Sequence, residues 1–134
     1  MITYAGIQVN WTTTSDRRWK DDIQDSPLGL EFLEALHPVD YFRKNDASKK
    51  RELGFIAQEV EPVLVQFGYK NSGMLSRDDD GYYSLRYNDL IAPIVKAIQE
   101  LAGSGKKARA EIQALQAEND HLKTRIDRLE KLMK

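Results

Sequence analysis

The sequence has no cysteine among its 134 residues, so disulfide bonds and thiolate metal sites are both excluded. No apolar run approaches the ~18 residues of a membrane span, and the N-terminus lacks the charged and apolar regions of a signal peptide. The sequence also has no excess of one charge sign, because it contains 20 Lys and Arg and 21 Asp and Glu. That balance gives no electrostatic basis for binding nucleic acid. We therefore expect one modest domain that binds neither nucleic acid nor membrane.

Ligand-binding motifs are absent as well, although two segments resemble them. Asp78-Asp79-Asp80-Gly81 suggests a calcium loop, but an EF-hand would need carboxylates where Ser76 and Tyr87 stand. Gly103-Ser104-Gly105-Lys106-Lys107 lacks the earlier glycine of a phosphate-binding loop, since Glu100 occupies that place. The histidines, His37 and His121, are far apart and have no partnering carboxylate pattern. We therefore expect no metal site and no cofactor.

The most informative stretch is Thr14 to Lys20, which brings a hydroxyl, a carboxylate and several cations together. From residue type and spacing, two interpretations remain open. In the first, Ser15 caps a helix whose first turn carries Asp16. In the second, Ser15 is a nucleophile and Lys20 is its general base, because a desolvated lysine can accept a proton from a hydroxyl.

Four motifs, in order along the chain, bear on this choice. They are Ser15-Asp16-x-Arg18-x-Lys20-x-x-Ile23, Leu36-x-Pro38-Val39-x-Tyr41, Gly54-Phe55-Ile56-Ala57-Gln58-Glu59-Val60 and Tyr87-x-x-Leu90-Ile91. Together they resemble the self-cleaving C-terminal intramolecular chaperone domain of phage endosialidase tailspikes, tail fibres and neck appendages. A relative of that domain occurs in the myelin regulatory factor. The resemblance covers residues 15 to about 134.

The resemblance implies a single-turnover serine peptidase that cuts its own chain between Thr14 and Ser15. Ser15 would be the nucleophile and Lys20 the general base, with Trp19 as a source of the apolar surroundings that a neutral lysine needs. Because five positions along a regular helix separate the two side chains, the backbone between them must leave helical geometry. Asp16 and Arg18 would orient the loop, or pair with each other or with neighbouring subunits.

The resemblance also implies a biological setting, a virion tail fibre or tailspike precursor made in the host cytoplasm. The domain would trimerise the upstream fibre, assist its folding and be released by cleavage. The partners would be two further copies of the chain and the upstream part of the same polypeptide. The alternative is a plain trimerisation cap whose Ser15 never reacts.

The sequence pattern predicts an α+β fold with three parts. Residues 1–14, with a strand at 2–11, would be the end of the upstream fibre, residues 15–90 the chaperone and cleavage domain, and residues 91–134 a coiled-coil helix. Within 15–90 we expect a helix from Ser26 that Pro38 ends, a strand over 39–43, a buried strand over 53–57, a helix over 59–67 and a turn at 78–81. Asn88 would cap the last helix.

The last segment carries heptads typical of a coiled coil, with Ile112 at an a position. The expected seam consists of Ile98, Leu101, Ile112, Leu115, Asn119, Leu122, Ile126 and Leu129. Opposite charges at facing g and e positions, such as Glu118 and Lys123, favour parallel chains. The pattern itself is the one usually associated with two strands, whereas the family resemblance implies a parallel homotrimer. Whether the helix continues through Gly103 to Gly105 stays open.

Overall fold

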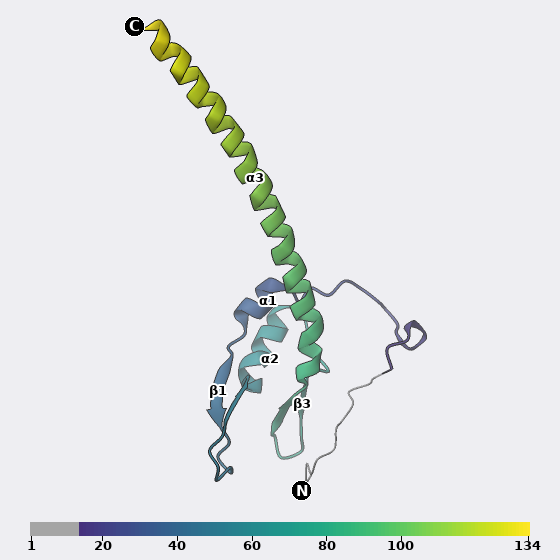
Figure 1. The fold of residues 1–134 in the computed structure, drawn as a ribbon. Helices are drawn as coiled ribbons and strands as arrows, with labels where there is room; N and C mark the ends of the chain where they lie inside the picture. The colour runs from purple at the N-terminus through teal and green to yellow at the C-terminus, as the bar shows by residue number, and fades with distance from the viewer. Residues whose placement is uncertain (1–13) are drawn as a thin grey trace.

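The computed structural model describes residues 14–134, and these form a small α+β body from which one long helix projects (Figure 1). The strand expected over residues 2–11 lies outside the described residues. In chain order the elements are η1 (Arg17–Trp19), α1 (Leu30–Ala35), β1 (Val39–Phe42), β2 (Arg51–Gly54), α2 (Ala57–Gln66), β3 (Leu75–Arg77), β4 (Tyr83–Leu85), η2 (Tyr87–Leu90) and α3 (Ile91–Leu132). The α+β expectation is confirmed, and the long C-terminal helix with it.

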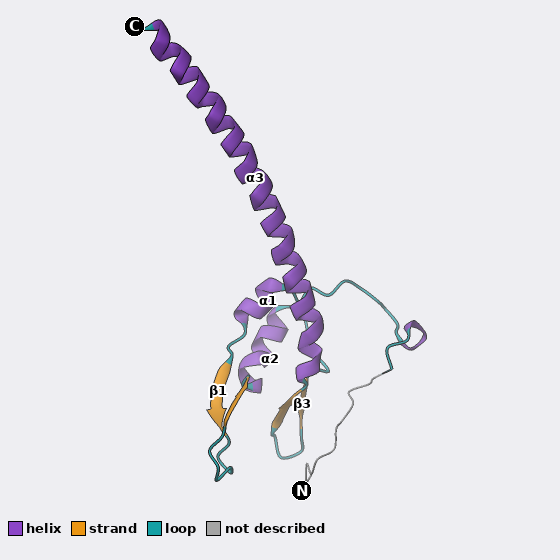
Figure 2. Cartoon of the chain, viewed as in Figure 1, coloured by secondary structure: helices purple, strands orange, loops and turns teal. Residues whose placement is uncertain are grey.

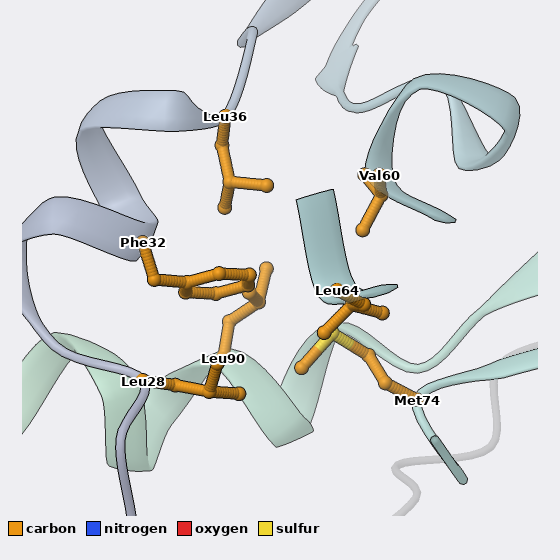
Figure 3. Packing of buried hydrophobic residues seen from close by; sticks show 7 residues of the cluster. All are labelled: Leu28, Phe32, Leu36, Val60, Leu64, Met74 and Leu90. Carbon is orange, nitrogen blue, oxygen red and sulfur yellow. The ribbon is translucent and has the colours of Figure 1, made fainter. Parts of the chain in front are cut away.

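The core lies where α1 and α2 meet the start of α3 (Figure 3). Phe32 and Leu64 are its fully buried side chains, and the Phe32 ring packs edge-on against Phe67 with 5.7 Å between ring centroids. Val60 of α2 also belongs to the cluster, and the segments around the helices supply the rest: Leu28, Leu36, Met74 and Leu90. Because α1 and α2 are short, it is this shared apolar contact that holds the body together.

Two antiparallel hairpins extend from the helices on the side away from the free end of α3 (Figure 2). In one, β1 pairs with β2, with Val39 opposite Gly54. In the other, β3 pairs with β4 across a turn in which Gly81 has a φ of 85°. The Tyr82 amide donates to the Asp78 carboxylate there at 2.7 Å, so the acidic run forms the expected turn.

The strand expected over 53–57 differs from the structure in position and in burial. β2 runs over Arg51–Gly54, and Leu53 is 83% exposed, so the expectation of a buried strand is wrong. A two-stranded sheet has no second layer over its outer face, which leaves Leu53 uncovered. Gly54 is closely approached by a side chain, because a Cβ there would lie 2.3 Å from the Tyr87 hydroxyl oxygen.

Helix boundaries also differ from the pattern. α1 starts at Leu30 rather than at Ser26, since Ser26 instead accepts a hydrogen bond from the Leu28 amide and forms a local turn. α2 starts two residues earlier than expected, which places Pro62 inside the helix and beyond its first turn. Asn88 does not cap α3, because it lies within η2, which leads directly into the long helix.

α3 is continuous through Gly103 to Gly105, which settles the question that the sequence left open. Its first turns pack on the body through Pro93 and Ala97, and the rest projects away from it. Every predicted seam position with a large apolar side chain is exposed in the single chain: Ile98, Leu101, Ile112, Leu115, Leu122, Ile126 and Leu129. Among residues 14–134, no helix is long and apolar enough to cross a membrane.

Candidate functional site

Ser15 and Lys20 lie at the two ends of η1, a single 3₁₀ turn, and their side chains meet. Lys20 Nζ donates a hydrogen bond to Ser15 Oγ at 2.8 Å. Asp16 and Lys20 both have extended backbone and flank the turn, which is closed by bonds from the Trp19 and Lys20 amides. This departure from α-helical geometry allows residues five positions apart to reach each other, because in a regular α-helix they would point in different directions.

Asp16, not Ser15, caps the turn. Its Oδ1 accepts from the Arg18 amide at 2.9 Å and from Arg18 Nε at 3.0 Å, while Oδ2 accepts from a terminal guanidinium nitrogen at 2.8 Å. The side-chain bond from Arg18 is the main reason why the pKa of Asp16 is below its ordinary value, with the amide bond adding to it. Of the arrangements left open by the sequence, the structure shows Asp16 paired with Arg18 in the same chain.

The surroundings of the Ser15–Lys20 pair are open. Both residues are exposed, and Trp19, the expected apolar neighbour, has 80% of its surface exposed. Ile23, the nearest further apolar residue along the chain, is also exposed. A single chain therefore brings the Ser15 and Lys20 side chains together but does not exclude water from them.

Residues 14–25, which we call the arm, stand apart from α1, α2 and α3 (Figure 1). Ser26, the next residue, is bonded to the body through Lys96. The hydrogen bonds described for residues 15–25 all lie within that stretch. At its root, Leu30 N donates to Glu100 Oε2 at 2.7 Å, and Lys96 Nζ donates to the Ser26 carbonyl oxygen. Sequence reasoning missed Lys96 and Glu100, because contacts across 70 positions leave no local pattern. The sequence indicates only that both residues lie outside the predicted seam, where a side chain is free to contact the body.

The other residues considered as ligands do not gather into a site. His37 Nδ1 lies 3.0 Å from Glu59 Oε2 at the surface, and His121 is exposed on α3. Within residues 14–134, no group of three or more histidine, aspartate or glutamate side chains is placed to hold a metal ion.

Comparison with known proteins adds a family to this geometry. No curated protein matches the chain. A model of a peptidase family, described as chaperone of endosialidase, matches residues 15–69. The match begins at Ser15, whose hydroxyl accepts the hydrogen bond from Lys20. It includes the rest of the arm, α1, the β1–β2 hairpin and α2. Residues 15–69 are therefore similar to the chaperone of endosialidase family, the family that the sequence motifs resemble.

Proposed function

We propose that this protein is an intramolecular chaperone that trimerises and helps to fold an upstream phage fibre or tailspike, then releases itself by cleaving the Thr14–Ser15 bond. The family assignment of residues 15–69 supports the chaperone and peptidase classes. The single observation that carries the cleavage proposal is the 2.8 Å contact between Lys20 Nζ and Ser15 Oγ. That distance is within the range over which a base takes a proton from a nucleophile.

In the proposed reaction, Ser15 Oγ attacks the carbonyl carbon of Thr14 through a five-membered ring, and the hydroxyl proton passes to neutral Lys20 Nζ. The Thr14–Ser15 C–N bond then breaks, so that the Thr14 acyl group becomes an ester on Oγ and the Ser15 nitrogen leaves as an amine with that proton. Water hydrolyses the ester, which gives a Thr14 carboxylate and restores the Ser15 hydroxyl. Because nucleophile and carbonyl are neighbours in one chain, little entropy of encounter is lost.

Assembly is proposed from the unpartnered apolar stripe of α3. Seven large apolar seam residues are between 44% and 59% exposed, an arrangement that a solitary helix in water does not favour. Packing three parallel copies would bury this stripe, with Asn119 fixing their register. The same assembly would bring the other chains near each exposed arm, where they could exclude water from Lys20 and favour its neutral form.

The test is intact-mass spectrometry of purified full chain over time. We expect wild type to yield a fragment that begins at Ser15, Ser15→Ala to stay intact, and Lys20→Arg to lose cleavage while remaining trimeric, because arginine keeps the charge but cannot act as a base. Ser104→Ala and Lys44→Arg, at exposed positions away from the arm, are the matched controls. The same fragment from Ser15→Ala would remove Ser15 from the mechanism, and wild-type cleavage by Lys20→Arg would remove the base.

The chaperone role is tested separately with an upstream fibre fused before Ser15. Strand pairing between distant segments is slow and exposes chains to aggregation, and tethering three chains raises their effective concentration. We therefore expect deletion of residues 15–134 before synthesis to leave the fibre insoluble or monomeric, and their removal after folding to leave it trimeric. A deletion variant that refolds to trimer as well as the full chain would contradict the chaperone role and leave only a trimerisation cap.

A further inference from the structure

Two charged side chains of α3 hold the root of the arm, although neither is near the reacting groups. Glu100 supplies the bond that caps the first turn of α1, because Gly29, the N-cap residue, has no side chain to do so. Lys96, one helical turn earlier, holds the Ser26 carbonyl oxygen. The two side chains also face each other at 3.7 Å and are 34% and 42% exposed. We call Lys96, Glu100 and their contacts at Ser26 and Leu30 the anchor.

The fit at the anchor is close and specific. Gly29 is buried, and a Cβ added to it would lie 2.5 Å from Glu100 Oε2. Ala97, between the two charged residues, is 2% exposed and gives α1 room to approach α3. Leu28, also within the anchored stretch, is 4% exposed in the core. The backbone of residues 26–30 is thus fixed by an apolar side chain on one side and by charge-assisted bonds on the other.

The anchor is placed so that it can act together with self-association. With Ile98 at an a position, Lys96 and Glu100 fall at f and c, outside the a and d positions that would face neighbouring chains. The seam and the anchor therefore lie on different sides of the same rigid turns of α3. Between Ser26 and Lys20 only residues 21–25 intervene, so Lys20 lies at most about 22 Å from Ser26 when this segment is extended.

We infer that Lys96 and Glu100 are positioning residues for self-cleavage, because they fix the root of the arm to the helix that trimerises. This inference rests on the proposed function. When α3 aligns with its copies, the anchor places each arm at a defined point relative to the neighbouring chains. Without the anchor, Ser15 and Lys20 still form their local pair, but the arm that carries them has no fixed place in the assembly. Cleavage slows although nucleophile, base and coil are all present.

The test compares variants that remove the anchor with conservative ones that keep it. Glu100→Ala removes the acceptor and Glu100→Gln keeps one; Lys96→Met removes the donor and Lys96→Arg keeps one. We expect the first of each pair to slow appearance of the Ser15 fragment about tenfold or more, and the second to restore most of the rate, as charge-assisted bonds of this kind imply. Asp127→Ala, which removes a carboxylate of α3 outside the seam and about 40 Å along the helix, is the control with unchanged rate.

Two further measurements separate positioning from loss of fold. Sedimentation should show the same oligomeric state for all variants, and hydrogen exchange at the Leu30 amide should accelerate in Glu100→Ala but not in Glu100→Gln. If Glu100→Ala fails to fold, Gly29→Ala decides, because the three atoms nearest to its Cβ all belong to the Glu100 carboxylate, which it must displace. Wild-type cleavage rates in Glu100→Ala and Lys96→Met would overturn the inference and leave the proposed function intact. A wild type that never cleaves would overturn both.

Discussion

Replacing Gly54 by alanine gives the sharpest test of packing in the body. A Cβ at this position would lie 2.3 Å from the Tyr87 hydroxyl oxygen and 3.2 Å from Cζ of the same ring. That hydroxyl oxygen accepts a hydrogen bond from the Phe55 amide at 3.1 Å. The new methyl group must therefore push the ring away and break this bond, which ties the end of β2 to η2.

The magnitude follows from three terms. Overpacking costs about 1–3 kcal/mol and the lost hydrogen bond about 0.5–1.5 kcal/mol, while replacing a glycine within a strand returns about 0.5–1 kcal/mol of backbone entropy. Tyr87 is 45% exposed, so its ring can move toward solvent and the overpacking falls at the lower end. The net destabilisation expected for Gly54→Ala is then about 1 kcal/mol.

A double-mutant cycle with Tyr87→Phe isolates the contact. Tyr87→Phe removes the oxygen that the methyl group would meet, so the double variant should be more stable than the sum of the single effects by at least about 0.5 kcal/mol. Urea unfolding followed by circular dichroism gives the four free energies, at one protein concentration and in a Ser15→Ala background, so that neither association nor cleavage differs between samples. Additive single effects, or a Gly54→Ala variant as stable as its parent, would refute the close approach of Gly54 and Tyr87.

Three other predictions concern the seam, the core and the turn that carries Ser15. Replacing Leu122 and Leu129 by aspartate puts unpaired charges in the seam and should give monomers by sedimentation, whereas a monomeric wild type would contradict the coiled coil. Phe32→Ala, at a side chain with no exposed surface, should lower the free energy of unfolding by about 3–5 kcal/mol, read from the urea midpoint. Asp16, whose folded pKa is below its ordinary value, binds Arg18 at neutral pH. The stabilisation of the turn by this pair should be lost only as the pH falls through that lowered pKa. A carboxyl NMR titration of Asp16 with an ordinary midpoint would contradict the pairing.

Much of the fold was predictable because it rests on local signals. The strand expected after Pro38 is β1, the acidic run before Gly81 forms the β3–β4 turn, and the heptads lie on α3. The errors came where tertiary contacts decide. Leu53 was expected to be buried because it is apolar, but the sheet that carries it stops at two strands. α1 starts at Leu30 rather than at Ser26, and the acceptor for its first amide is Glu100, a residue of α3.

The sequence predicted which residues make up the candidate site, but not the contacts that hold them in place. Ser15 and Lys20 were named from residue type and family resemblance, and the structure brings their side chains together. Asp16 as the capping residue was not expected, since serine and aspartate are about equally good caps and sequence alone does not rank neighbours. The contacts of Lys96 and Glu100 could not be predicted from the sequence, because their partners are backbone groups that nearly every residue type provides.

The uninterrupted passage of α3 through Gly103 and Gly105 has a mechanical consequence. Nothing lies within 4 Å of a Cβ built at either glycine, so packing in the single chain does not require them, and each weakens the helix by about 1 kcal/mol relative to alanine. Three chains side by side would place six such residues within about one turn of the bundle. In such an assembly α3 would be one continuous helix whose two parts unfold separately. The part before the glycines shares the stability of the body, and the part after them depends on contacts with the other chains. Heat or dilution should separate the parts after the glycines first, while the arms are still held at their roots.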